Sequence, residues 1–419
     1  MSYVEELGAA AKAAERELLK YGTAQKNAAL AAIAKKLTDE TAAILRENAR
    51  DFENAEQNGM PQAMRDRLTL NEARIRAMSE GVLQVAALAD PIGEVIGGGE
   101  LPNGLMIVKK RVPLGVIGII FESRPNVTVD AAALCLKSGN VCVLRGGSDA
   151  IYSNKCLVRL MREAIGEAGL PADAVQLVVD TSRLVANELM KADRYIDVLI
   201  PRGGGGLIRS VRENATIPVI QTGEGNCHVY VDRFADIDLA VSIVDNAKTQ
   251  RPSVCNAIEN VLVHKDVAEQ FFTALQKKWN GKVKIVGDET TAKYIPVERI
   301  AEEEDYRREF LDYVITSRVV SSADEAIAHI NRYGTRHSEC IVTVHLETAE
   351  KFQRLVDAAA VYVNASTRFT DGFEFGLGAE IGISTQKLHA RGPMGLTELT
   401  TYKYLINGNG QIRGEGFVK

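Results

Sequence analysis

Residues 112–148 read VPLGVIGIIFESRPNVTVDAAALCLKSGNVCVLRGGS. The apolar run from Val112 to Phe121 predicts a buried strand, and the residues from Val129 to Lys137 predict an apolar helix. A turn at Ser138-Gly139-Asn140 leads into a second buried strand, Val141 to Leu144. Strands that alternate with helices in this way are typical of a parallel sheet covered on both faces. The stretch therefore predicts an α/β fold.

The same alternation continues along the chain, after about ninety residues whose apolar positions have helical spacing. In the first half, helices are expected near 150–168, 182–192 and 205–213, with strands at 175–179, 198–200, 218–220 and 229–231. In the second half, helices are expected at 234–249, 266–279 and 323–332, with strands at 261–264, 283–286, 314–320, 341–345 and 361–364. A strand is also expected from Leu105 to Lys109, and the tail from Tyr402 to Val418 alternates as an edge strand would.

The composition is that of a soluble globular protein. The chain has 419 residues, of which 46% are hydrophobic and 25% are charged, and its net charge is -5. Such a length predicts roughly two or three domains. Basic residues form no cluster, so neither nucleic acid nor a membrane is predicted as a partner. The longest apolar run is too short to span a bilayer, and the N-terminus is typical of an amphipathic helix rather than a signal peptide. The six scattered cysteines indicate reduced thiols in the cytoplasm.

Cys255 is the candidate nucleophile. It lies in QRPSVCN, residues 250–256, a polar connection between an expected helix and an expected strand, and such loops commonly carry catalytic groups. Arg251 would lower the pKa of the Cys255 thiol or hold an anionic group of the substrate. The alternative for any cysteine is a buried structural role. That alternative is preferred for three cysteines in apolar runs: Cys135, Cys142 and Cys156.

Two glycine turns follow expected strands and are candidate phosphate-binding loops. The first is Arg145-Gly146-Gly147-Ser148, at the carboxyl end of its strand, where parallel sheets bind ligands. The second is Gly203-Gly204-Gly205-Gly206, whose N–H groups would meet phosphate at a helix N-terminus, although the run does not match GxGxxG. A flexible turn and a solvated arginine are the alternatives.

Asn126 also follows a strand, and its side-chain amide would donate a hydrogen bond to a developing oxyanion. An ordinary turn or helix-capping residue is the alternative.

No metal site is predicted, because the sequence has no CxxC or HExxH, and His337 with Cys340 is an isolated pair. A serine hydrolase is disfavoured because there is no GxSxG.

Taken together, these residues resemble the aldehyde dehydrogenase superfamily over nearly the whole chain. PLGVIGII from Pro113 is similar to the strand that leads to the family's oxyanion-hole asparagine, and SGNV from Ser138 is similar to the turn before its cofactor strand. Cys255 stands where the family's nucleophile would be, and Glu309-Phe310-Leu311 resembles the segment that touches the nicotinamide ribose. The resemblance implies a Rossmann-type cofactor domain, an α/β catalytic domain and a small β oligomerisation flap.

Four longer stretches resemble one branch of that superfamily, the gamma-glutamyl phosphate reductases. They are FESRPNVTVDA at 121–131, QRPSVCNAIEN at 250–260, VYVNASTRFTDG at 361–372 and GAEIGISTQKLHARGPMGL at 378–396. The resemblance implies NADPH-dependent reduction of L-glutamyl 5-phosphate to L-glutamate 5-semialdehyde and phosphate, through a cysteine thioester, in proline biosynthesis.

The candidate residues then take three roles. Those expected to be catalytic are Cys255 and Asn126. Those expected to bind the cofactor, NADPH or NADP+, are Arg145, Gly146, Gly147, Ser148, Gly203, Gly204, Gly205 and Glu309. Those expected to bind the substrate are Arg124, Arg251, Ser366, Thr367 and Arg368. A structural salt bridge is the alternative for each arginine.

Gln221 departs from the pattern of the superfamily. Hydrolytic members carry a glutamate base in a Glu-Leu-Gly-Gly segment, and the corresponding stretch here is Gln221-Thr222-Gly223-Glu224. Gln221 cannot accept a proton from water, and Glu224 is three residues out of register. This departure disfavours the nearest alternative, a hydrolytic NAD(P)-dependent aldehyde dehydrogenase. A non-catalytic protein that kept the fold is a further alternative.

Arg145, with no evident acidic residue to bind a free 2′-hydroxyl, favours NADPH over NADH.

The resemblance also implies boundaries and partners. The NADP-binding domain would span 1–102 and 113–230, the catalytic domain 231–397, and the flap 103–112 and 398–419. An exposed strand edge is a template for pairing, so the flap predicts a homodimer or homotetramer. The lability of an acyl phosphate motivates glutamate 5-kinase as a candidate partner.

Overall fold

The computed structural model describes residues 1–413, which form two compact units. Within the described residues, the first unit comprises 1–220, 378–381 and 395–413, and the second comprises 221–377 and 382–394. The units therefore divide ten residues before the predicted domain boundary at 230. The reason is that Cys227–Val231 forms a strand that pairs within the sheet of the second unit.

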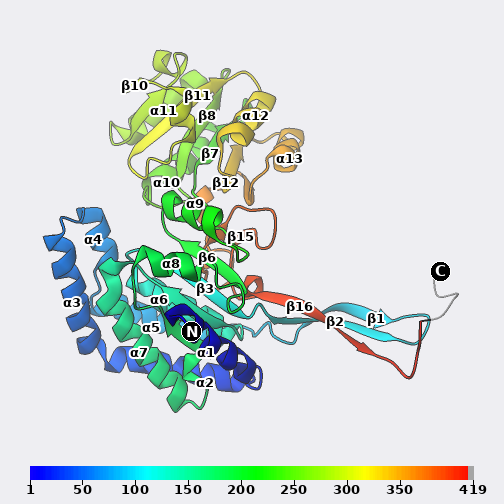
Figure 1. Cartoon of the computed structure of the whole chain (residues 1–419). Helices are drawn as coiled ribbons and strands as arrows, with labels where there is room; N and C mark the ends of the chain where they lie inside the picture. Colours follow the sequence, from blue (N-terminus) through cyan, green and yellow to red (C-terminus); the bar gives the residue numbers. More distant parts are fainter. Residues whose placement is uncertain (414–419) are drawn as a thin grey trace. The chain divides into compact units, whose positions relative to one another are not determined.

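The first unit contains nine helices within the described residues (Figure 1). They are α1 (Tyr3–Leu18), α2 (Thr23–Asp39), α3 (Thr41–Gln57), α4 (Gln62–Leu68), α5 (Glu72–Ala87), α6 (Pro125–Lys137), α7 (Ile151–Glu167), α8 (Arg183–Leu189) and α9 (Gly205–Asn214). Its strands are β1 (Val95–Glu100), β2 (Met106–Pro113), β3 (Val116–Phe121), β4 (Val141–Arg145), β5 (Val175–Leu177), β6 (Val198–Arg202) and β16 (Thr400–Asn407). Short 3-10 turns are η1 (Ser148–Ala150), η2 (Ala172–Ala174) and η6 (Thr397–Leu399).

The stretch at 112–148, which predicts the α/β fold, forms the parallel strands β3 and β4, joined by α6. All six residues of β3 are buried, and the sheet has the order β5-β4-β3-β6 with every pairing parallel. Gly139 ends α6 with a φ of +74°, and Asn140 donates its N–H back to the Cys135 carbonyl, 2.8 Å away. This left-handed glycine cap closes the helix and turns the chain into β4.

Three details differ from the expectation. The predicted strand Val112 to Phe121 is interrupted between β2 and β3, because Gly115 adopts a φ of +124° there. The helix begins at Pro125, four residues before the predicted start, since proline is favoured in the first helical turn. The predicted strand at 218–220 is reduced to one bridge, between Leu199 and Val219.

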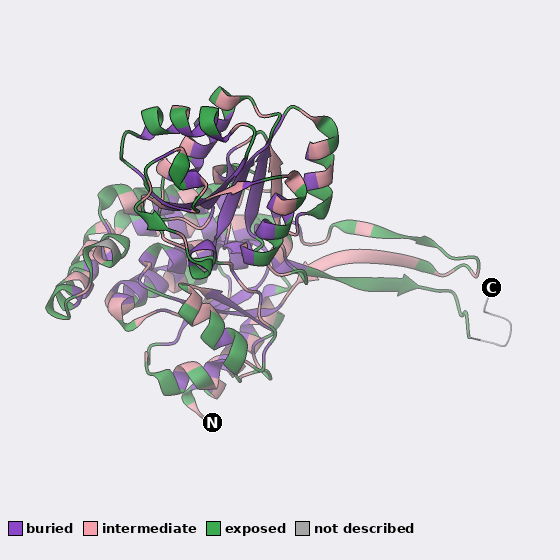
Figure 2. Ribbon diagram, turned by 90° about the horizontal axis from the view of Figure 1, so that it is seen from above, coloured by how far each residue is buried: buried purple, intermediate pink, exposed green. Residues whose placement is uncertain are grey.

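The strands β1, β2 and β16 form an antiparallel sheet, here called the arm, which extends away from the rest of the first unit (Figure 1). Most of its residues are exposed or half-buried, and seven of the eight residues of β16 are exposed (Figure 2). The arm includes β1, which the predicted flap left out. The last part of the predicted flap and tail strand, residues 414–419, lies outside the described residues.

The second unit is built on a seven-stranded parallel sheet. Its helices are α10 (Ile237–Thr249), α11 (Ala268–Trp279), α12 (Ala323–Tyr333) and α13 (Leu346–Leu355). Its strands are β7 (Cys227–Val231), β8 (Ile258–His264), β9 (Lys284–Gly287), β10 (Arg299–Ile300), β11 (Val314–Val320), β12 (Ser338–Val342), β13 (Ala360–Val363), β14 (Ile383–Ser384) and β15 (Gly392–Pro393). Its 3-10 turns are η3 (Thr291–Lys293), η4 (Glu303–Arg307) and η5 (Thr367–Phe369). The order in the large sheet is β10-β9-β11-β8-β7-β12-β13.

Helices cover both faces of this sheet, and successive residues of its strands pack alternately against the helices of one face and of the other. Val229 of β7 and Val261 of β8 pack on one side with α10 and α11. Their neighbours Tyr230 and Leu262 pack on the other side with α12 and α13. Because successive side chains of a strand point to opposite faces, a fully buried strand needs apolar residues at nearly every position. No helix within residues 1–413 is long and apolar enough to cross a bilayer.

Candidate active site

Cys255 lies in the loop that joins α10 to β8, near the middle of the large sheet. Because this loop precedes β8, the thiol is at the amino end of a parallel sheet, not at the carboxyl end where such sheets usually bind ligands. Cys255 is half-buried, whereas the other five cysteines are buried. It is thus the most accessible of the six cysteines, and its role as the nucleophile stays a prediction.

Residues at the start of β7 and just before it contact the main chain of Cys255. A Cβ added to Gly225 would lie 1.5 Å from the Cys255 carbonyl oxygen, so the two backbones touch at this glycine. The Cys227 thiol donates a hydrogen bond to the same carbonyl, over 3.2 Å. Sequence reasoning missed both residues, because the contact joins two loops that no local pattern connects.

A third loop, after β13, is tied to the nucleophile loop by hydrogen bonds. The Thr367 hydroxyl donates to the Asn256 carbonyl over 2.7 Å, and the Asn256 side chain donates to the Thr370 carbonyl over 2.8 Å. The Arg368 Nε donates to the Gln250 side chain, 2.8 Å away. The two loops therefore form one rigid assembly around the thiol.

Two of the predicted substrate arginines come together here. Burial lowers the pKa of Arg368, the positive charge of Arg251 lowers it further, and the Cys255 thiol acts in the opposite direction. Arg251 is exposed and Arg368 is half-buried. The predicted residues Ser366 and Thr367 are both buried and use their hydroxyls inside the protein, so their role toward a substrate stays a prediction.

Glu309 is held beside the nucleophile loop. Its Oε1 accepts a hydrogen bond from the Gly225 N–H over 2.9 Å, and burial raises its pKa. Two residues on, the Leu311 N–H donates to Glu259, which pairs with Lys248 over 2.7 Å. Both side chains of this ion pair are fully buried, and burial raises the pKa of Glu259 and lowers that of Lys248. The segment that carries Glu309 is therefore anchored to the core of the second unit.

Gln221 lies six residues before the start of β7. Its N–H donates to the Gln386 side chain over 3.0 Å. Glu224, the nearest carboxylate in this stretch, is exposed. No carboxylate therefore stands at residue 221 to activate water.

Arg145 is the last residue of β4, in the first unit. Its Nη2 donates to the Thr181 carbonyl over 2.7 Å, while its Nε is buried and has no hydrogen-bond partner within residues 1–413. Burial lowers the pKa of Arg145, against the attraction of Asp149 and Asp180. The arginine thus keeps an unused buried donor at the carboxyl end of its strand.

The glycine positions after β4 and β6 differ in what surrounds them. A Cβ on Gly146 would lie 2.3 Å from the Asn154 side-chain amide, and one on Gly147 would lie 2.2 Å from the Asp149 carboxylate, so a larger residue would have to displace those side chains. Ser148 begins η1. Gly203 and Gly204 precede α9, whose first residue is Gly205.

The turn before α9 already holds an anion of the chain itself. The Gly204 N–H donates to the Glu122 carboxylate over 3.0 Å. Sequence reasoning missed Glu122, which stands 82 residues earlier in the chain. A phosphate at this turn would compete with that carboxylate.

Asn126 lies in the first turn of α6, directly after Arg124 and Pro125, and its side chain is exposed. Its Nδ2 donates to Asp130 over 3.1 Å, and burial raises the pKa of Asp130 to about 6. One amide N–H of Asn126 remains for another acceptor.

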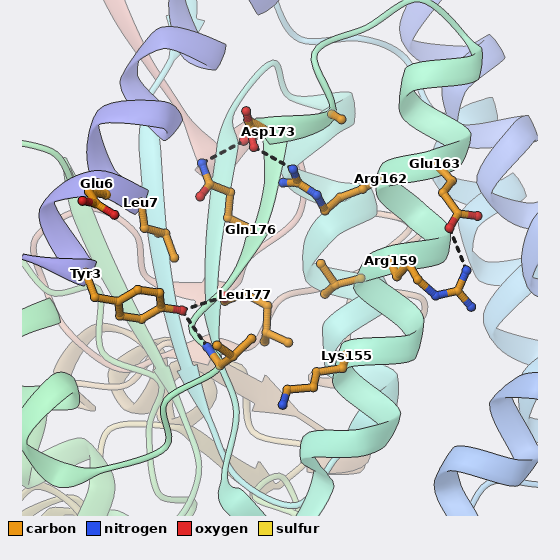
Figure 3. Close-up of a pocket in the computed structure, with 13 residues that line it drawn as sticks. Tyr3, Glu6, Leu7, Lys155, Arg159, Arg162, Glu163, Asp173, Gln176 and Leu177 are labelled. Carbon is orange, nitrogen blue, oxygen red and sulfur yellow. Dashed lines mark hydrogen bonds and ion pairs between the residues drawn. The ribbon is translucent and has the colours of Figure 1, made fainter.

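The first unit also has a cavity of about 700 Å³ between α1, α7 and β5 (Figure 3). It contains none of the predicted site residues. Its charged side chains are largely paired with one another, as in Arg162 with Asp173 at 2.8 Å and Arg159 with Glu163 at 2.7 Å. No three His, Cys, Asp or Glu side chains within residues 1–413 gather as a metal site would require.

Comparisons with known proteins agree with the resemblance of the sequence. The model of the aldehyde dehydrogenase family matches residues 2–306. The gamma-glutamyl phosphate reductase of Moorella thermoacetica is 58% identical over 411 residues, which cover 98% of each chain. That of Carboxydothermus hydrogenoformans is 58% identical over 416 residues, covering 99% of this chain and 100% of the relative. The crystal structure of the gamma-glutamyl phosphate reductase of Thermotoga maritima has a TM-score of 0.96 at 47% identity, covering 99% of this chain and 100% of that one.

Proposed function

Since the chain belongs to the aldehyde dehydrogenase family, and within it to the gamma-glutamyl phosphate reductases, we propose that it reduces L-glutamyl 5-phosphate to L-glutamate 5-semialdehyde and phosphate with NADPH. It is an oxidoreductase of proline biosynthesis. The observation that carries the proposed mechanism is the half-buried Cys255, held on a rigid loop beside Arg251 and Arg368.

In this mechanism the Cys255 thiolate attacks the acyl carbon of the substrate, and the bond to the phosphate oxygen breaks. The electron pair of that bond leaves with phosphate, and a thioester remains on Cys255. Arg251 and Arg368 suit the phosphate and carboxylate groups of the substrate, because the guanidinium fork can bind either in a bidentate manner. Arg124 is the third candidate for this task.

The charge that develops on the carbonyl oxygen needs donors. We assign them to the Cys255 N–H and to the Asn126 side chain, whose second amide N–H is left over after the bond to Asp130. Loss of one such donor typically lowers kcat on the order of a hundred- to a thousandfold. Gln221 fits this chemistry because it puts no carboxylate base at the position where hydrolytic members carry one, and this argues against the hydrolytic dehydrogenase.

The cofactor site is proposed at Arg145, Gly146, Gly147, Ser148, Gly203, Gly204, Gly205 and Glu309. The unpartnered buried Nε of Arg145 fits an anionic ligand, and an arginine at this place favours a 2′-phosphate over a free hydroxyl. When bound, the nicotinamide supplies the hydride that reduces the thioester to the aldehyde. The chain's own task is to keep the thioester positioned and water out.

A second copy of the chain is the proposed partner of the arm. Tyr402, Tyr404 and Ile406 on β16 are 48%, 57% and 58% exposed, and β16 is the edge of its sheet. An exposed edge strand with apolar side chains is a template for pairing with another subunit. We propose a homodimer or homotetramer in the cytoplasm, which receives its labile substrate from glutamate 5-kinase.

The reverse reaction tests the proposal. Glutamate 5-semialdehyde, supplied as its cyclic pyrroline form, is mixed with enzyme, NADP+ and inorganic phosphate, and reduced cofactor is followed by absorbance. We expect a rate that rises with phosphate and is near background without it. We also expect NADP+ to give a higher kcat/KM than NAD+. An equal rate without phosphate would mean that water is the acceptor, and the hydrolytic dehydrogenase would then be the better assignment.

A further inference from the structure

Cys227 is a buried thiol that takes no part in the proposed chemistry, yet it touches the nucleophile loop. It is the first residue of β7, it is fully buried, and its Sγ lies 3.2 Å from the Cys255 carbonyl oxygen. His337 Nδ1 lies 3.7 Å from the same sulfur, and the Ser338 backbone N–H is a further donor that faces it. The position of its proton decides what this thiol does.

A chain of buried side chains fixes that proton. The Ser338 hydroxyl donates to the Thr370 hydroxyl over 2.6 Å, so the Ser338 oxygen accepts from His337 Nδ1, which is 2.8 Å away. His337 therefore carries its proton on Nδ1 and presents it toward Ser338 and Cys227. The Nε2 of His337 is buried without a hydrogen-bond partner in the described part of the chain, so a proton placed there would be an unpaired buried donor, whereas a proton on Nδ1 has the Ser338 oxygen as its acceptor.

The thiol is left with one acceptor. Because His337 presents an N–H toward Cys227, the S–H proton cannot be donated to the imidazole, and it points to the Cys255 carbonyl. Burial lowers the pKa of His337 to about 4 and raises the pKa of the Cys227 thiol well above its usual value. Both groups therefore keep this arrangement across the neutral pH range, and Cys227 is a poor nucleophile itself.

The main chain of Cys255 and Asn256 is then held by contacts at two successive carbonyls. The Cys227 thiol bonds to the Cys255 carbonyl, Gly225 packs against the same carbonyl, and the Thr367 hydroxyl bonds to the Asn256 carbonyl. We propose that Cys227 is a positioning residue for the reaction, which acts by fixing the main chain of Cys255 so that its thiol and its N–H keep their attack geometry. This inference rests on the proposed role of Cys255 as nucleophile.

Three variants test it in the reverse assay with semialdehyde, NADP+ and phosphate. Cys227→Ala removes the donor, Cys227→Ser keeps one, and Cys340→Ala is the matched control. Cys340 is also fully buried, on the adjacent strand β12, but its thiol donates to the Ile341 carbonyl rather than to the nucleophile loop. Both alanine variants remove the same atoms from the same sheet.

We expect Cys227→Ala to lower kcat about fivefold to tenfold, with KM values for semialdehyde and phosphate within about twofold of the parent, because loss of one neutral hydrogen bond misplaces the nucleophile without touching the substrate. Cys227→Ser should recover kcat to within about twofold, and Cys340→Ala should match the parent. If Cys227→Ala does not fold, Cys227→Val fills the space without a donor and takes its place in the comparison.

The inference is overturned if the serine variant is as slow as the alanine variant, or if Cys227→Ala and Cys340→Ala lower kcat equally. Failure of the proposed function would look different. In that case the parent would show no phosphate-dependent reduction, or the Cys255→Ala variant would remain active, whatever residue stands at 227.

Discussion

Replacement of Cys255 by alanine is expected to lower kcat at least about 10⁴-fold, because removal of a covalent nucleophile costs several orders of magnitude even where binding is intact. The thioester cannot form without the sulfur, and Arg251 and Arg368 cannot replace it. Cys255 is half-buried and lies in a loop, so its removal leaves the packed core unchanged. The measurement is the phosphate-dependent reverse rate, with thermal unfolding recorded in parallel.

The matched control is Cys340→Ala, which removes a thiol from the core and should reduce the melting temperature more than the rate. A Cys255→Ala variant that keeps more than about a hundredth of the parent rate would contradict a covalent mechanism at this residue.

Gly225→Ala is expected to lower kcat/KM at least about a hundredfold, because a misplacement of about 1 Å at a nucleophile can have an effect of that size. The added Cβ would lie 1.5 Å from the carbonyl oxygen of Cys255 and 2.5 Å from its Cα, and both are backbone atoms that cannot rotate away. The nucleophile loop must therefore move. Overpacking of this kind also destabilises the fold, typically by about 1–3 kcal/mol.

Gly166→Ala in α7 is the control for this second variant. Nothing lies within 4 Å of an added Cβ there, so the change should preserve activity and raise stability by roughly 0.5–1 kcal/mol through helix propensity. Urea unfolding and kcat/KM are measured on both variants. If Gly225→Ala retained kcat/KM within about threefold of the parent, the backbone contact at Gly225 would not hold the nucleophile in place.

The α/β fold of the chain could be predicted because strands and helices each leave a local pattern of apolar residues in the sequence. The apolar strands of residues 112–148 are buried on both sides, so nearly every position is apolar, and the turn at Gly139 needs a left-handed residue. The apolar pattern places the start of α6 too late, because the residue that marks the start is Pro125 in the first helical turn. The break at Gly115 was missed because a glycine inside an apolar run gives no sign of its φ.

The candidate site was predicted only in part, because many of its contacts join residues that lie far apart in the sequence. Cys255 could be singled out from its polar loop and from the resemblance to a family. Gly225 and Cys227 could not, since their meeting with Cys255 depends on how two parallel strands bring their preceding loops together. The carboxylate of Glu122 at the turn before α9 was missed for the same reason.

The central claim is that the reverse reaction forms a thioester on Cys255, and that phosphate, not water, attacks this thioester and releases the acyl group. The most direct test is a rapid-mixing measurement of reduced cofactor with semialdehyde, excess NADP+ and no phosphate. We predict a burst of reduced cofactor that approaches one equivalent per chain and then stalls, and resumed turnover when phosphate is added. Continued turnover without phosphate would contradict the account, since it would mean that water attacks the acyl group despite Gln221. Full turnover with phosphate but no burst without it would also contradict the account, since it would mean that no thioester accumulates on Cys255.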